Sequence, residues 1–171
     1  MLLSPKADTF QEAIQVKWID PLLIEDKISL LRAAGKRIAT LNGSFDLMHA
    51  GHLEIIYQAS LQADILIVAL NTDRSIQQYK SPLRPIIPLQ DRLQMMAALE
   101  MVDYVTWFDE TDPRALLSRI RPDVHVNGAE YKENCIEAET VTSCGGRLHL
   151  VQLIPGLSTS QIIKKIVAVC G

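Results

Sequence analysis

Two histidines, His49 and His52, stand three residues apart in the polar turn 42–52. The turn follows an apolar, β-rich run at 37–41 and precedes a segment with helical periodicity. Short residues in such a turn let backbone N–H groups approach an anion, and the next helix directs its positive end at the same point. The two imidazoles add hydrogen-bond donors that are cationic when protonated. The spacing therefore predicts a phosphate-binding turn, whose short residues are Asn42, Gly43 and Ser44.

Zinc is the competing chemistry for a pair of histidines. A zinc site needs a third and usually a fourth protein ligand. His125 and His149 lie within strand-like runs, and the three cysteines show no paired spacing. We therefore expect no metal site built from protein side chains. The odd number of unpaired cysteines instead favours free thiols in a reducing cytoplasm.

Polar residues also follow the second strand-like run. Asn71 and Asp73 come directly after 65–70, where a residue such as Asp73 also serves as a helix N-cap. The proline-stiffened loop that follows carries Lys80 and Arg84. Such residues are usually solvated surface charges, but at this edge of the sheet they could also neutralise a polyphosphate. Arg92 lies in the first turn of the next helix, where the helix dipole disfavours a cation unless an anion compensates.

Two more motifs precede or follow expected elements. Asn127 and Gly128 follow a fourth apolar run; Asn-Gly is first a turn signal, but at a strand end it also presents backbone groups to a base or sugar. The hydroxyl run 158–160 opens the final helix, and its exposed N–H groups form a second anion site. We expect the two helix starts to hold the same phosphates from opposite sides.

Apolar runs alternate with helical stretches along the chain. The runs are continuously apolar, as in strands covered on both faces. This alternation predicts an α/β fold with a doubly wound, mostly parallel, five-stranded sheet of Rossmann-like type, with ligands beyond the carboxyl ends of the strands. The expected strands are 37–41, 65–70, 104–108, 124–126 and 148–153. The expected helices are 20–34, 52–62, 89–101, 114–120, 135–144 and 158–169.

Composition allows one domain and excludes some classes of partner. The chain has 171 residues, of which 48% are hydrophobic, so it can bury a sizeable core. A net charge of −3 gives no general attraction to nucleic acid or an anionic membrane, and we expect neither as a partner. We expect no signal peptide and no membrane span, and hence a cytoplasmic protein. Residues 1–34 are expected to form an arm and a helix, loosely packed over 1–18, ahead of the main domain at 35–171.

The turn at 42–52 resembles the HxGH signature of the cytidylyltransferase-like nucleotidyltransferase superfamily, whose members join a nucleotide to a phosphorylated small molecule. The similarity extends in order over roughly residues 35–168 to the bacterial adenylyltransferases that act on D-glycero-β-D-manno-heptose 1-phosphate in ADP-heptose synthesis. The segments that carry it are 42–52, 71–73, 80–85, 88–92, 97–103, 121–123, 145–146 and 155–160.

This resemblance implies transfer of AMP from ATP to the sugar 1-phosphate for lipopolysaccharide core synthesis, with pyrophosphate released and Mg²⁺ held mainly by the nucleotide. The resemblance leaves open whether the protein forms a homodimer. The residues implied in catalysis are His49, His52, Lys80 and Arg92. Those implied in nucleotide binding are Asn42, Gly43, Ser44, Phe45, Asp46, Gly51, Asn71, Asp73, Asn127, Gly128, Glu130, Ser158, Thr159 and Ser160. Those implied in substrate binding are Arg84 and Tyr131.

One departure from that family bears on the substrate. The family commonly shows Lys-Gly-Gly-Asp-Tyr where this chain has Asn127-Gly-Ala-Glu-Tyr131. The lysine's charge is lost and the carboxylate reaches farther. The identity of the acceptor or of the nucleotide is therefore left open. Two alternatives therefore stand beside the adenylyltransferase: a CTP-dependent cytidylyltransferase of the glycerol-3-phosphate type, and a nucleotide-binding module without catalysis.

Overall fold

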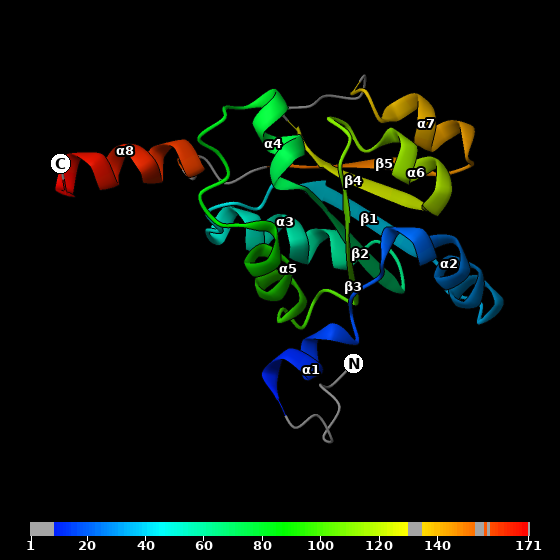
Figure 1. Ribbon diagram of the computed structural model, residues 1–171. Coiled ribbons are helices and arrows are strands. Elements are labelled where there is room, and N and C mark those ends of the chain that lie inside the picture. Colours follow the sequence, from blue (N-terminus) through cyan, green and yellow to red (C-terminus); the bar gives the residue numbers. More distant parts are fainter. Residues whose placement is uncertain (1–8, 130–134, 153–155, 157, 171) are drawn as a thin grey trace.

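The computed structural model describes residues 9–129, 135–152, 156 and 158–170, and it is built around one five-stranded sheet (Figure 1). The strands lie in the order β3-β2-β1-β4-β5, and all neighbouring pairs are parallel. The predicted doubly wound parallel sheet is confirmed. The strands are β1 (Ile38–Gly43), β2 (Ile65–Asn71), β3 (Tyr104–Phe108), β4 (Val124–Gly128) and β5 (Arg147–Val151).

Helices cover both faces of the sheet. On one face α3 and α5 pack against alternate strand residues such as Leu41 and Val68, and on the other α2 and α6 pack against Ile38 and Ile67. The helical elements are α1 (Phe10–Gln15), the 3₁₀ turn η1 (Pro21–Leu23), α2 (Ile24–Ala33), α3 (Ala50–Ser60), α4 (Asp73–Tyr79), α5 (Leu89–Ala97), α6 (Arg114–Ile120), α7 (Ala138–Ser143) and α8 (Thr159–Cys170). None of them, within the described residues, has the length and apolar character needed to cross a membrane.

The strand order reverses at β1. Chain order runs outward from β1 through β2 to β3, and then resumes on the other side with β4 and β5. Loops that leave the carboxyl ends of β1 and β4 therefore diverge to opposite faces and leave a crevice between them. The turn that contains His49 and His52 begins at that point, between β1 and α3.

Aspartates fix the opposite edge of the sheet. Asp64, Asp103 and Asp123 each precede a strand, and each accepts a 2.8 Å hydrogen bond from a backbone N–H at the start of the neighbouring strand. These bonds satisfy donors that would otherwise lack a ladder partner. They hold the strands in register, and so they also set which residues end each strand at the ligand edge.

The segment before the sheet differs from the expected loose arm. From residue 9 onward it contains α1, whose Ile14 is fully buried in the core. The ammonium of Lys17 donates to the backbone oxygens of Leu99 and Val102, at 2.8 and 2.7 Å. Six residues of helix give too short an apolar period to detect in sequence, and the tertiary contacts supply the stability.

His125 lies in the middle of β4 and is fully buried. Its Nδ1 is 2.8 Å from the hydroxyl of Thr40 on β1, and its Nε2 has no partner among the described residues. Burial lowers the pKa of His125 to about 4. The folded protein therefore holds this imidazole neutral at pH 7, and charging it opposes folding.

Stability should fall in mild acid because of this residue. Between pH 6.5 and about 4 the unfolded chain binds a proton at His125 that the folded chain does not, so the free energy of unfolding decreases as pH drops through that window. One such proton contributes a slope of up to about 1.4 kcal/mol per pH unit. The free energy of unfolding, measured with urea at pH 7 and pH 5, should depend less on pH in His125→Gln than in the wild type. An equal pH dependence in the two proteins would contradict the assignment.

Candidate active site

A pocket of about 500 Å³ opens at the carboxyl ends of β1, β2 and β4. It is bordered on one side by the start of α3 and on another by the start of α8, so the two predicted anion sites do face one cavity. The predicted residues that line it are Asn42, Gly43, Ser44, Phe45, His49, Gly51, His52, Asn71, Lys80, Asn127, Gly128, Ser158, Thr159 and Ser160.

Phe45 shapes the turn after β1. Its φ of 44° is left-handed, a strained value for a residue with a large side chain. The turn thereby tucks the ring inward, where it is 4% exposed and meets the His52 ring edge-on at 5.5 Å between centroids. A Cβ at Gly43 would lie only 3.1 Å from the same ring. A side chain at position 43 would therefore press on the Phe45 ring, which would have to shift by a few tenths of an ångström.

The two histidines form a neutral pair whose rings lie close together and tilted by 31°. Their ring centroids are 4.0 Å apart, and the backbone N–H of His49 donates to Nδ1 of His52 at 3.3 Å. Burial, followed by the charges of His49 and Lys80, lowers the pKa of His52 to about 4, and burial also lowers the pKa of His49. With Nδ1 of His52 accepting, its proton sits on Nε2. The free protein therefore offers neutral donors here.

Two buried polar atoms of the pocket lining lack partners. They are Nδ1 of His49 and Oδ1 of Asn42, and neither has a hydrogen bond within the described residues. Buried polar groups are normally satisfied, and the exceptions need a reason. A ligand that supplies the missing partners is the reason that fits a pocket, because both residues border the same open space.

Lys80 is the cation among the described residues that line the pocket. It closes α4, and its ammonium donates to the hydroxyl of Ser44 at 2.9 Å. Burial is the main cause that lowers the pKa of Lys80; the neighbouring Arg84 and Arg92 lower it further, and Asp46 opposes them. A phosphate beside Lys80 would relieve this repulsion.

Arg92 lies behind the pocket and not in its lining. Its side chain is fully buried and donates to the backbone oxygens of Ser44 (2.6 Å), Asn71 (2.9 Å) and Ile87 (2.9 Å). It also pairs with the carboxylate of Asp73 at 2.6 Å. The guanidinium thus joins the loop after β1, the end of β2 and the start of α4, and its donors are directed at protein oxygens.

Asp46 and Arg84 form a second pair outside the lining. Asp46 is 1% exposed and pairs with Arg84 at 2.6 Å, while its other oxygen accepts from the backbone N–H groups of Ile86 and Ile87. The pair anchors the proline-rich loop to the turn after β1. The predicted contacts Glu130 and Tyr131 fall outside the described residues.

Sequence reasoning did not select several residues that line the pocket. Asp112 and Pro113 follow β3, and a polar residue at a strand end was a usable signal, although an Asp-Pro pair is also typical of a helix start. Glu137 gave no signal because it falls in a segment predicted to be helical from 135, whereas α7 begins at Ala138. The remaining ones are Leu41, Ile55, Tyr79, Thr111 and Ile136.

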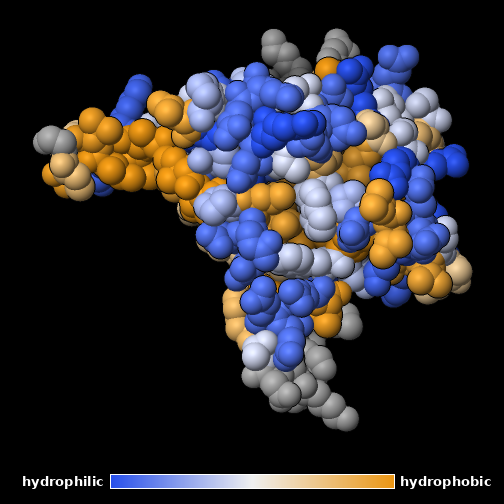
Figure 2. Space-filling model, in the orientation of Figure 1, coloured by the Kyte–Doolittle hydropathy of each residue, from blue (hydrophilic) through white to orange (hydrophobic). Residues whose placement is uncertain are grey.

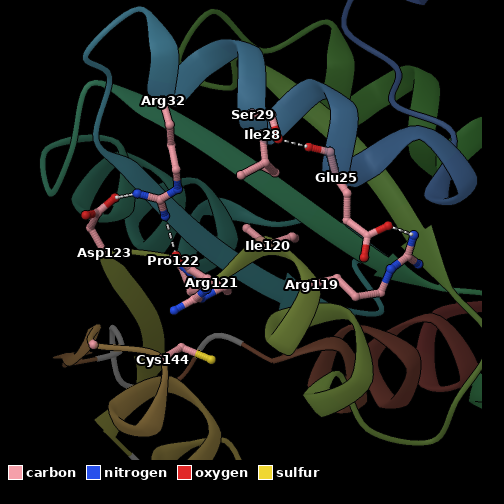
Figure 3. Close-up of a pocket in the computed structure, with 11 residues that line it drawn as sticks. Glu25, Ile28, Ser29, Arg32, Arg119, Ile120, Arg121, Pro122, Asp123 and Cys144 are labelled. Carbon is pink, nitrogen blue, oxygen red and sulfur yellow. Dashed lines mark hydrogen bonds and ion pairs between the residues drawn. The ribbon is translucent and has the colours of Figure 1, made fainter.

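A second cavity, of about 470 Å³, lies between α2 and α6 (Figure 3). Its charged groups are largely paired with each other: Arg32 with Asp123, and Arg119 with Glu25. It contains none of the residues predicted to contact phosphate. The pocket at the carboxyl edge is therefore the candidate active site.

The comparison with known families agrees with this geometry. Residues 40–165 match the cytidylyltransferase-like family, and the chain belongs to it.

Among individual proteins, the chain is similar to the bifunctional protein HldE of several bacteria. It is 44% identical over 156 residues to the HldE of Methylobacillus flagellatus, covering 91% of this chain and 32% of that protein. It is 40% identical over 144 residues to the HldE of Syntrophotalea carbinolica, covering 84% of this chain and 29% of that protein. The chain thus spans about a third of the length of these relatives.

A solved structure shares the fold. The crystal structure of the lipopolysaccharide core biosynthesis protein from Thermoplasma volcanium superposes with a TM-score of 0.57, at 24% identity, over 70% of this chain and 98% of that one.

Replacing Arg92 should damage the scaffold even without ligand. Arg92→Lys leaves the buried oxygens of Ser44, Asn71 and Ile87 only partly satisfied, so we expect the free energy of unfolding to fall by roughly 2–4 kcal/mol. The matched control is Arg74→Lys, whose side chain is 72% exposed and paired with Asp109, and which should cost less than about 1 kcal/mol. Urea unfolding of the free proteins measures both. Wild-type stability in Arg92→Lys, with lost nucleotide affinity, would instead make Arg92 a phosphate ligand.

Proposed function

We propose that the protein transfers AMP from ATP to a sugar 1-phosphate, with D-glycero-β-D-manno-heptose 1-phosphate as the acceptor and pyrophosphate as the second product. The observation that carries the proposal is the single pocket that gathers the histidine pair, Lys80 and the hydroxyl-rich start of α8. Membership of the cytidylyltransferase-like family and the similarity to HldE proteins support it.

The proposed reaction is an in-line displacement at the α-phosphorus of ATP. An oxygen of the sugar 1-phosphate forms the new bond to that phosphorus, and the bond to the oxygen bridging the α- and β-phosphates breaks. Pyrophosphate leaves with the electron pair. Such a transfer needs alignment and charge neutralisation more than covalent catalysis. The residues proposed to supply them are His49 and His52 at the α-phosphate, and Lys80 and 158–160 at the β- and γ-phosphates.

Neutral histidines suit this role. As negative charge builds on the α-phosphate oxygens, the hydrogen bond from the Nε2–H of His52 strengthens, because a charged acceptor binds a donor more tightly than a less charged one. The interaction is then tighter in the transition state than with bound ATP, which is the condition for raising kcat. A histidine that is already cationic in the free protein would also bind the phosphate of ground-state ATP tightly, and so would raise kcat less.

Mg²⁺ is proposed to enter with the nucleotide. Among the described residues no three His, Cys, Asp or Glu side chains are grouped to hold a metal ion. Mg²⁺ keeps much of its water and binds readily to nucleotide phosphates, so it fits a site that offers few protein ligands. Its contribution is to neutralise charge on the polyphosphate.

We also propose a cytoplasmic homodimer. The helix α8 projects from the body, and none of its residues is buried (Figure 1). Its apolar side chains form a continuous exposed surface, with Ile166 50%, Val167 64% and Val169 73% exposed (Figure 2). A second copy that covers this surface is the proposed partner, and equilibrium sedimentation tests it: a monomer at micromolar concentration contradicts it.

A substrate panel tests the function. Pyrophosphate release is measured with ATP, CTP, GTP and UTP, each against heptose 1-phosphate and several sugar and polyol phosphates. We expect turnover with ATP and heptose 1-phosphate. Turnover only with CTP and glycerol 3-phosphate would favour the cytidylyltransferase alternative. Nucleotide binding without pyrophosphate release from any pair would reject transferase activity.

His52 should act mainly on turnover. Removing a preorganised donor to the transition state costs on the order of 10²–10³ in rate, so His52→Ala should lower kcat by about 10² or more and leave ATP affinity within a few-fold. His149→Ala, on β5 and outside the pocket lining, is the matched control and should keep kcat. Equal losses in ATP affinity and kcat would assign His52 to ground-state binding, and unchanged kcat would remove it from the mechanism.

A further inference from the structure

The carboxyl end of β4 places an amide beside a carboxylate at the pocket. Asn127 and Glu137 both line the pocket and are 5% and 6% exposed. The amide of Asn127 donates to Oε2 of Glu137 at 3.4 Å and to the sulfur of Cys135 at 3.3 Å. Burial is the main cause that raises the pKa of Cys135, so the thiol adds no negative charge at pH 7.

The Glu137 carboxylate has unused acceptor capacity. A carboxylate accepts about four hydrogen bonds, and a buried one is costly unless it is well bonded. Within the described residues Glu137 forms no ion pair; its carboxylate accepts from the Asn127 amide at 3.4 Å and from the Cys135 thiol. The nearby Arg114 has its pKa raised chiefly by Asp112, with which it pairs, and only to a smaller degree by Glu137. The carboxylate therefore borders the open pocket without a full set of donors.

The two sides of the pocket differ in charge. Lys80, the histidine donors and the start of α8 favour phosphate, whereas the anion of Glu137 repels it. A ligand with a charged polyphosphate and an uncharged, hydroxyl-rich portion matches both sides when its hydroxyls point toward β4. Hydroxyl groups donate well to a carboxylate, and a vicinal pair can bond to both of its oxygens.

We propose that Glu137 is a specificity-determining residue that binds a vicinal pair of hydroxyl groups, with Asn127 as the residue that positions its carboxylate. This inference rests on the proposed nucleotidyl transfer and adds to it which end of the substrate lies at β4. Two sources carry this chemistry, the ribose of the nucleotide and the hydroxyls of the acceptor sugar.

The test compares Glu137→Gln with the matched control Glu139→Gln, an exposed residue of the same helix α7. Glutamine keeps the volume and removes the charge. Calorimetry gives dissociation constants for ATP and its 2′-deoxy and 3′-deoxy analogues, and for the acceptor and its deoxy analogues. If Glu137 binds the ribose, we expect Glu137→Gln to weaken ATP binding roughly 10- to 100-fold; if it binds the acceptor, the same loss is expected for the acceptor. In either case the deoxy analogue should bind Glu137→Gln as tightly as the hydroxylated ligand does.

A second variant approaches the same carboxylate from its neighbour. Asn127→Lys places an ammonium where it can pair with Glu137, so it should also abolish the preference for hydroxylated over deoxy ligand. Thermal unfolding checks that each variant is folded. The proposal is overturned if Glu137→Gln matches Glu139→Gln for all ligands, if hydroxyl removal weakens the variant as much as the wild type in both series, or if Asn127→Lys keeps the preference. Because binding is measured, absence of pyrophosphate release would count against the proposed function alone.

Discussion

The buried guanidinium of Arg92 holds the cationic side of the pocket together. One side chain satisfies backbone oxygens at the start of the loop after β1, at the end of strand β2 and in the proline-rich loop, and it pairs with the carboxylate that opens α4. A planar group with five donors can meet four such partners, which an ammonium cannot. The ammonium of Lys80 contacts the hydroxyl of Ser44, so the position of this pocket-lining cation depends on a group that does not itself line the pocket.

Much of the fold follows from local sequence patterns. The five apolar runs became the five strands within a few residues, because continuous apolarity marks strands that are covered on both faces. The segment 114–120 was predicted with its observed bounds, because the preceding Asp-Pro gives a strong start signal. The helix α1 was missed, since its six residues depend on the burial of Ile14 against distant elements rather than on their own period.

The site was predictable as a location and less so in its details. Strand ends mark where polar motifs converge, and most of the expected residues do line one pocket. A cation in the first turn of a helix needs a compensating anion, and for Arg92 this anion is Asp73. The sequence does not identify this partner, because the two residues meet only in the folded chain. Likewise, no local pattern indicates that Glu137 lies beside Asn127. The charge state of His52 depends on burial and on Lys80, which are both tertiary effects.

Within the described residues these contacts give a pocket with two neutral imidazole donors, one ammonium, two helix starts and, beside Asn127, a carboxylate that can accept further hydrogen bonds. The central claim is that nucleotide phosphates lie between the starts of α3 and α8. A crystal structure with a non-hydrolysable ATP analogue tests it most directly. The account predicts the α-phosphate within hydrogen-bond distance of His52 and the β- and γ-phosphates at Lys80 and at residues 158–160. Nucleotide bound elsewhere, for example in the cavity between α2 and α6, or phosphates remote from His52, would contradict it.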